Sequence, residues 1–171
     1  MKAVAFLAAF TALCTSAIAD HDVFPGSFDA FSEVEALYYK GQNGAVPEYV
    51  PDAINCSIAD GVVRVFGTTN STLVYSLDFF NGTATSVDLN MAADYRPGVI
   101  TQVDVRVDSP TSPSIATIVL TSTGGQYDFV TFSSGVAVAP QGVRDVYFIF
   151  ATDQRDTESY YCHFNWFQFI L

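Results

Sequence analysis

The middle of the chain reads Thr101-Gln102-Val103-Asp104-Val105-Arg106-Val107-Asp108, an alternation of apolar and polar residues. Side chains two positions apart lie on the same face of a β-strand, so the three valines share one face and the charged residues share the other. A strand with one buried and one wet face is typical of an antiparallel sheet that covers a core on one side. The stretch therefore predicts sheets rather than helices.

Short β-branched and aromatic runs, broken by Gly, Pro, Asn, Asp and Ser, continue on both sides of this strand. Further strands are expected at Glu33–Tyr39, Val62–Phe66, Leu73–Phe80, Ser86–Met91, Ser114–Thr121, Tyr127–Phe132, Val143–Phe150 and Tyr161–Ile170. Turn signals recur at short intervals, and helical periodicity is nearly absent. The pattern predicts an all-β protein, a jelly-roll β-sandwich of two antiparallel sheets.

The composition is that of a globular protein with an acidic surface. Of the 171 residues, 50 % are apolar and only 15 % are charged, and the formal net charge is −11. Nucleic acids and anionic membranes are bound through clustered Lys and Arg, which this chain lacks. The charge balance therefore argues against a nucleic-acid or membrane partner, and we expect a monomer that binds a neutral partner.

Residues 1–19 have the features of a secretory signal peptide. Lys2 is followed by an apolar run and by small residues ending in Ala17-Ile18-Ala19, which is the order of a signal peptide and its cleavage site. No later stretch approaches the roughly 18 apolar residues of a membrane helix. We expect a secreted, extracellular protein with a short leader at residues 20–32 and one domain at residues 33–171.

If the protein is exported, its cysteines and three short motifs predict covalent modifications. Cys56 and Cys162 remain after cleavage, and in an oxidising compartment they are expected to form a disulfide. In the loop-entropy model, closing a loop of roughly 100 residues contributes about 4 to 5 kcal/mol. Three N-x-[ST] sequons, at Asn55, Asn70 and Asn81, predict glycosylation in a eukaryotic secretory pathway.

The last third of the chain carries a family resemblance. The motifs are Gly142-Val143-Arg144-Asp145-Val146-Tyr147-Phe148-Ile149-Phe150 and His163-Phe164-Asn165-Trp166-Phe167-Gln168-Phe169. They resemble the closing strands of family 6 carbohydrate-binding modules. Val34-Glu35-Ala36-Leu37-Tyr38-Tyr39 is similar to the opening strand of that family, and Ser122-Thr123-Gly124-Gly125 is similar to one of its loops. The resemblance implies a jelly roll that binds polysaccharide, such as β-glucan or xylan, without catalysis.

The resemblance also implies a site made of two aromatic rings and an amide at one end of the sandwich. Laid on this sequence, the first aromatic position falls on Phe66 and the second on Gln126, which is followed by Tyr127. If a strand has already begun at Tyr127, its ring points to the opposite face. The amide position falls on His163. We take Phe66, Gln126, Tyr127 and His163 as candidate carbohydrate-binding residues, while Trp166 is expected to have a structural role.

Two further sites are weighed on the same basis. The charged face of the Thr101–Asp108 strand could bind sugar hydroxyls, but a solvated ladder of ion pairs is the simpler interpretation of such alternation. The family often holds a structural calcium ion, which requires six to eight oxygen ligands. Here Glu35 keeps one carboxylate, while Leu37 and Asn165 replace two others, and Glu33 could compensate. The two missing charges argue against a bound ion, and we expect no other cofactor.

The sequence contains few residues that could form a catalytic site. Glycoside hydrolysis needs two carboxylates that flank a cleft, and Glu33 and Glu35 lie too close together on one strand. No nucleophile, metal or nucleotide motif occurs. The sequence therefore predicts a protein that is not an enzyme and binds a neutral cell-wall polysaccharide. The alternative is an extracellular structural or protein-interaction domain that has kept the sandwich and lost the sugar site.

Overall fold

The computed structural model describes residues 26–49, 61–66, 71–93, 100–125, 127–152 and 161–171. The predicted signal peptide, Cys56, Asn55, Asn70 and Gln126 lie outside these residues. The strands are β1 (Phe28–Asp29), β2 (Val34–Glu35), β3 (Gly41–Asn43), β4 (Ala45–Tyr49), β5 (Gly61–Phe66), β6 (Ser71–Asp78), β7 (Ser86–Ala93), β8 (Ile100–Val107), β9 (Ser114–Val119), β10 (Val130–Gly135), β11 (Val143–Thr152) and β12 (Tyr161–Ile170). A 3-10 helix, η1 (Ala36–Tyr38), follows β2.

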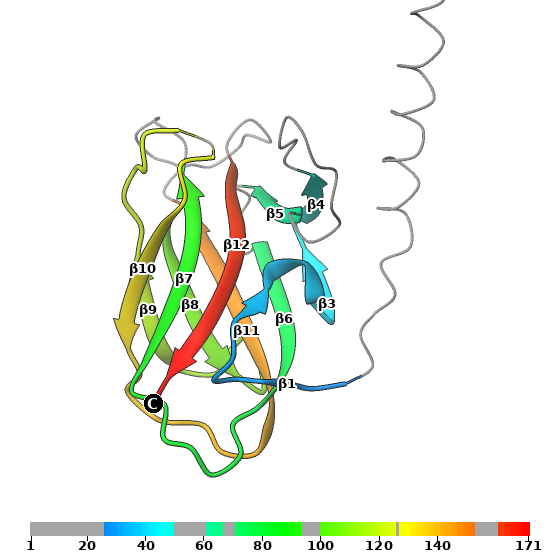
Figure 1. The fold of residues 1–171 in the computed structure, drawn as a ribbon, viewed down its shortest axis with the longest axis vertical. Helices are drawn as coiled ribbons and strands as arrows, with labels where there is room; N and C mark the ends of the chain where they lie inside the picture. The colour runs from blue at the N-terminus through cyan, green and yellow to red at the C-terminus, as the bar shows by residue number, and fades with distance from the viewer. Residues whose placement is uncertain (1–25, 50–60, 67–70, 94–99, 126, 153–160) are drawn as a thin grey trace, which may run out of the picture.

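The strands form two facing sheets, as predicted for a jelly roll (Figure 1). The first sheet has the order β1-β6-β11-β8-β9, and β3 also pairs with β6. The second has the order β10-β7-β12-β5-β4, and β2 also pairs with β12. All the pairs are antiparallel except β1 with β6, which is parallel. Most neighbouring strands, such as β6 and β11 or β7 and β12, come from distant parts of the chain.

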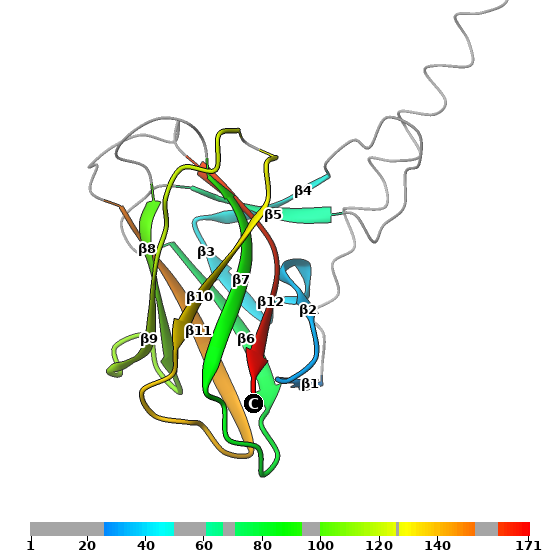
Figure 2. The ribbon, with the colours of Figure 1, turned by 60° about the vertical axis from the view of Figure 1, so that its left-hand side comes forward.

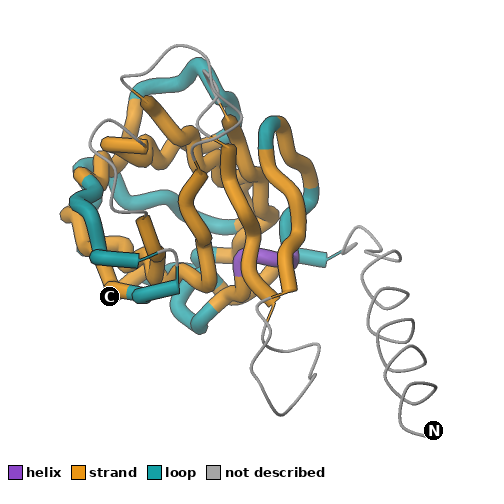
Figure 3. The backbone as a smooth tube through the Cα atoms, turned by 90° about the horizontal axis from the view of Figure 1, so that it is seen from above, coloured by secondary structure: helices purple, strands orange, loops and turns teal. Residues whose placement is uncertain are grey.

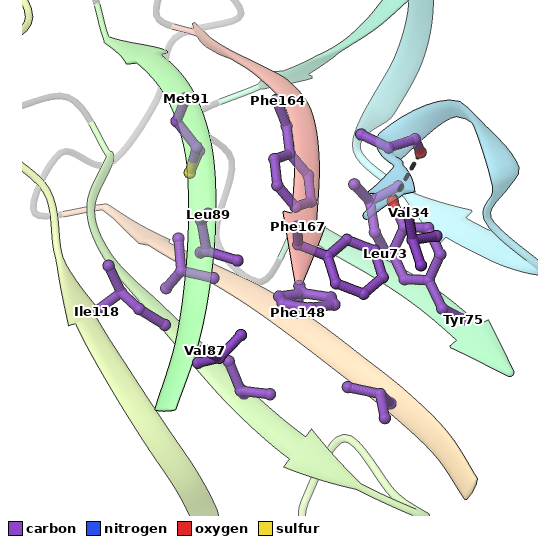
Figure 4. Close-up of a cluster of buried hydrophobic side chains, with 14 of the residues drawn as sticks. Val34, Leu73, Tyr75, Val87, Leu89, Met91, Ile118, Phe148, Phe164 and Phe167 are labelled. Carbon is purple, nitrogen blue, oxygen red and sulfur yellow. Dashed lines mark hydrogen bonds between the residues drawn. The ribbon is translucent and has the colours of Figure 1, made fainter. Parts of the chain in front are cut away.

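Aromatic rings interlock between the sheets. Tyr75 and Phe148, from the first sheet, meet Phe167 of the second with ring centroids 4.7 Å away in both pairs. The ring of Phe164 lies 5.7 Å from that of Phe148, and Figure 4 shows the four rings in one cluster. All four side chains are fully buried. The edge-to-face contact of Tyr75 with Phe167 adds to the free energy gained from burying the apolar area.

The alternation in the opening stretch predicts the first sheet correctly. Val103 and Val105 in β8 are completely buried, while Asp104 and Arg106 lie on the outer face. The strand pairs with β11 on one side and with β9 on the other. It is therefore a central strand whose inner face contributes to the core.

The prediction of a continuous strand over Glu33–Tyr39 is wrong beyond Glu35. Ala36 and Leu37 are both buried although they are neighbours, which the alternation of a strand does not allow when only one face meets the core. The chain instead turns into η1. The buried Tyr75 hydroxyl donates a hydrogen bond of 2.7 Å to the carbonyl of Ala36 and so fixes this turn.

Part of the predicted leader is integrated into the domain. Phe28 and Asp29 form β1 beside β6, and Ala30 is completely buried. The amide of Phe169 donates to the carbonyl of Ala30 at 2.9 Å, and the Gln168 side chain donates to the carbonyl of Phe31. Residues 28–31, which we assigned to the leader, therefore pack against the sandwich. Short strands β3 and β4, which the sequence pattern did not predict, extend both sheets at the same side.

Among the described residues, no helix is long and apolar enough to cross a membrane. The same part of the chain contains no disulfide, and Cys162 is a free, buried thiol. Burial raises the pKa of this thiol well above its usual value, so the side chain is neutral. Its predicted partner, Cys56, lies outside the described residues, and a Cys56–Cys162 bond stays a prediction.

Candidate functional site

The loop between β9 and β10 forms one end of the sandwich, next to the start of β12 (Figure 2). Gly124 has φ +102°, a backbone conformation that is favourable only for glycine. Thr123 anchors the loop, because its Oγ1 accepts a hydrogen bond of 3.0 Å from the amide of Ala93 at the end of β7. The amide of Asp128 donates to the carbonyl of Gly125 at 3.3 Å. The Ser-Thr-Gly-Gly motif therefore builds a turn that is attached to the second sheet.

This turn places Tyr127 against His163. The ring centroids are 4.8 Å apart and the planes are tilted by 36°. We expected the Tyr127 ring on the opposite face if a strand had begun there, but β10 begins only at Val130. Tyr127 belongs to the turn, so strand alternation does not determine its direction. The Tyr127 residue is half-buried, and it lies at the end of the molecule that Figure 3 shows from above.

His163 lies in β12 between Arg64 of β5 and Ala92 of β7. Its exposed fraction is 0 %, so in this structure it cannot touch a sugar in solution as the amide position of the family does. Its ring instead packs against the Tyr127 ring. This differs from the prediction, and one contact that contributes to the burial is the Tyr127 ring of the β9–β10 loop, which packs against His163.

The remaining predicted positions are only partly described. The backbone of Phe66 ends β5 and pairs with Tyr161, two residues before His163. Gln126 lies outside the described residues. Sequence reasoning missed Arg64, which faces His163 in register and is half-buried. The signal was available, because Arg64 is the only charged residue in the Gly61–Phe66 strand and alternates with the buried Val63 and Val65.

The charged stripe on β8 is an internal network of ion pairs. Asp104 Oδ2 lies 3.1 Å from Arg106 Nη2, and Asp104 Oδ1 accepts from Thr117 and from Gln102, each at 2.9 Å. Asp108 pairs with Arg144 of β11 at 3.0 Å. Because both carboxylate oxygens of Asp104 are already engaged, the stripe fits the ion-pair interpretation better than a sugar site.

Replacing Asp104 with asparagine should lower the free energy of unfolding only at pH values at which the Asp104 carboxylate is ionised. Burial alone would raise its pKa, but hydrogen bonds from Thr117, Arg106 and Gln102 and the charge of Arg106 lower that pKa below the usual 3.8. A lowered pKa contributes stability above pH 3.8, and protonation removes it as the pH falls through the folded-state value. Urea unfolding across the acid range should therefore show a wild-type advantage over Asp104→Asn that shrinks below this pH. A difference independent of pH would contradict the ion-pair assignment.

The described residues hold no group of three or more His, Cys, Asp and Glu side chains arranged for a metal ion. Glu35 is the carboxylate kept at the family's calcium position, and it interacts with Tyr38. Burial raises the pKa of Tyr38, and the charge of Glu35 and a hydrogen bond with it raise that pKa further. Asn165 donates instead to Asn90 Oδ1 at 3.0 Å, and Leu37 is buried. Two positions therefore serve other contacts, and this donor set does not fit a calcium ion.

Asn90 and Thr131 extend the Asn165 contact across the outer face of the second sheet. The Asn90 amide donates to Thr131 Oγ1 at 3.4 Å, and a bulge in β12 at Asn165 brings the amides together. Trp166 pairs in register with Asn90 and with Glu35. Its half-buried position in the middle of paired strands is consistent with the structural role expected for it.

Comparison with known proteins gives a consistent picture. A family model described as carbohydrate binding module (family 6) matches residues 35–170. A family 6 module studied by crystallography and titration calorimetry for its binding sub-sites is 25 % identical, with a TM-score of 0.67 over 85 % of this chain and 98 % of that one. A family 6 module from Clostridium cellulolyticum, solved with xylose, is also 25 % identical, with a TM-score of 0.68 over 84 % of this chain and 99 % of that one.

A third structure extends the likeness in fold. The β-1,3-glucan-binding module from Bacillus halodurans is 23 % identical, with a TM-score of 0.66 over 85 % of this chain and 100 % of that one. No curated protein matches the sequence.

Proposed function

The chain belongs to family 6 of the carbohydrate-binding modules, and from that premise we propose that it binds a neutral cell-wall polysaccharide of the β-glucan or xylan type without catalysing a reaction. The proposed site is the end of the sandwich that carries Tyr127. The observation that supports it most directly is the half-buried Tyr127 ring, held against His163 with a centroid separation of 4.8 Å.

The chemistry of this end suits a sugar ring. A pyranose presents an apolar C–H face and a rim of hydroxyls, so it is held by an aromatic face together with a few polar groups. Tyr127 supplies the aromatic ring and its phenolic hydroxyl, and the exposed Asp128 is next to it in the same turn. The net charge of −11 disfavours an anionic polysaccharide. A neutral ligand therefore fits this end best.

Family 6 is a family of non-catalytic modules, and the proposal involves no bond cleavage. The xylose complex of the module from Clostridium cellulolyticum makes a xylan-type ligand a reasonable first choice, and β-glucan is the second. The rest of the earlier expectation, secretion into the extracellular space as a monomer, is part of the same proposal, because a cell-wall polysaccharide is met outside the cell.

Retention on insoluble polysaccharides tests the proposal. The folded protein should be retained on xylan or on a β-glucan, and titration calorimetry with soluble oligomers of the retained polymer should show saturable binding. Incubation with the same polymers should release no reducing sugar, because no chemistry is proposed. If a correctly folded sample is retained on none of xylan, β-1,3-glucan, cellulose and chitin, the binding proposal is wrong.

One observation favours the second candidate function, a structural or protein-interaction domain. His163 is completely buried, so the polar group at the family's amide position is not displayed. A sandwich that has lost this group could keep its fold for another extracellular role. Binding to none of the polysaccharides, together with an intact fold, would support this alternative.

A further inference from the structure

The end of the sandwich opposite Tyr127 carries an unusual aromatic residue. Phe80 follows β6 and is 56 % exposed, and its φ is +47°. A bulky residue rarely adopts this left-handed conformation, which costs on the order of 1 to 3 kcal/mol and persists only where surrounding contacts impose it. In Figures 1 and 2 the connection from β6 to β7 and the connection from β10 to β11 lie together at this end, beside the C-terminus.

Hydrogen bonds hold Phe80 in this conformation. Its amide donates to Asp78 Oδ1 at 2.8 Å, and its carbonyl accepts from the amide of Gly142 at 3.2 Å. The amide of Gly82 closes the turn by donating to the carbonyl of Phe79 at 2.9 Å. The backbone is thus fixed on both sides, and the Phe80 ring is presented outward.

Gly82 fixes the next part of the turn. A Cβ at this position would clash with the Phe31 ring and would lie 2.9 Å from Cδ2 of Leu171, so a larger residue would require these side chains to move. The carbonyl of Gly82 accepts a hydrogen bond of 2.9 Å from the Gln141 side chain. The turn is therefore packed on its inner side and exposed on its outer side.

The outer side of this turn is the sequon Asn81-Gly82-Thr83. Asn81 and Thr83 are both exposed, and neither side chain has a hydrogen bond to another residue in the described part of the chain. The acceptor amide and the hydroxyl that a glycosyltransferase must reach are both accessible. The exposed Phe80 ring is the immediate neighbour of Asn81 in the chain.

We propose that Asn81 carries an N-linked glycan whose first N-acetylglucosamine stacks on the Phe80 ring. In the transfer, Asn81 Nδ2 forms a bond to the anomeric carbon of a lipid-diphosphate-linked oligosaccharide. The bond from that carbon to the diphosphate oxygen breaks, the amide loses one proton, and the lipid diphosphate leaves. The proposal depends on entry into a eukaryotic secretory pathway, as predicted from residues 1–19, and is independent of polysaccharide binding.

The stacking gives a role to two features of this turn, the exposed ring and the left-handed backbone conformation that presents it. An exposed phenylalanine costs solvation free energy, and a sugar C–H face would cover it. The strained turn pre-orients the ring beside the attachment point, so little conformational freedom is lost when the sugar docks. The glycan would also lie at the end away from Tyr127, where it leaves the proposed polysaccharide site open.

The test uses the full chain in a eukaryotic secretory host, with Asn55→Gln and Asn70→Gln present throughout so that Asn81 is the only acceptor. Mass spectrometry of the secreted protein should find Asn81 occupied. Enzymatic removal of the glycan should lower the thermal midpoint by about 2 to 4 °C, the shift expected from one stacking contact in a domain of this size. NMR should show the protons of the first sugar shifted upfield by the ring current of Phe80.

Phe80→Gly is the matched variant, because glycine keeps φ +47° without strain while the side chain with its ring is removed. In this variant, glycan removal should leave the thermal midpoint unchanged, and the upfield shifts should disappear. Equal losses of midpoint in Phe80→Gly and in the parent protein would overturn the stacking. Protein that is secreted with Asn81 empty, or that stays unmodified in the cell, would overturn the modification itself.

Discussion

Replacement of Tyr127 by alanine should weaken binding to the retained polysaccharide about tenfold or more, which corresponds to at least about 1.4 kcal/mol. The β9–β10 turn places this half-buried residue with its ring against His163. Removing it deletes the stacking surface and also uncovers the buried imidazole. Titration calorimetry with a soluble oligomer measures the change in affinity directly.

Two controls separate stacking from damage to the fold. Tyr127→Phe keeps the ring and loses only the hydroxyl, so it should retain most of the affinity. Tyr147→Ala removes a half-buried tyrosine from β11 in the other sheet and should leave binding unchanged. If Tyr127→Ala and wild type bind the polysaccharide equally well, another surface carries the binding. If neither protein binds, the protein-interaction alternative is favoured.

The sequence predicted the sheet architecture well because the predictive signal is local. Alternation along β8 separates the buried Val103 and Val105 from the outer Asp104 and Arg106, and it does so without knowledge of any other strand. The 3-10 turn at Ala36 and Leu37 is different. It depends on a hydrogen bond from Tyr75, which is far away in the chain, so local periodicity could not reveal it.

The sequence named the candidate residues through motif resemblance but could not give their surroundings. The motif resemblance named both Tyr127 and His163, and the structure brings them into contact. The burial of His163 was not predictable, since alternation assigns a residue to a face of a sheet but does not say what covers that face. The direction of Tyr127 depends on where β10 begins. β10 begins only at Val130, and element boundaries are the least reliable part of a pattern-based prediction.

Replacement of Phe148 by alanine should lower the free energy of unfolding by about 3 to 5 kcal/mol, the range for a large aromatic residue removed from a packed core. Phe148 is completely buried. Its ring lies 5.6 Å from Tyr75 in its own sheet and 4.7 Å from Phe167 in the facing sheet. The cavity would therefore open between the sheets, where three rings lose a common partner (Figure 4). Such a loss is a large share of the roughly 5 to 15 kcal/mol of a typical domain.

Urea unfolding measures this loss, and the neighbouring residue provides the control. Tyr147 precedes Phe148 in β11 and faces the outer side of the sheet, where it is half-buried, so Tyr147→Ala removes a similar ring without opening the core and should cost much less. Phe148→Leu should fall between the two, because leucine fills most of the volume and keeps the apolar contacts. If Phe148→Ala and Tyr147→Ala cost the same, the rings between the sheets do not stabilise the sandwich in the way that their contacts indicate.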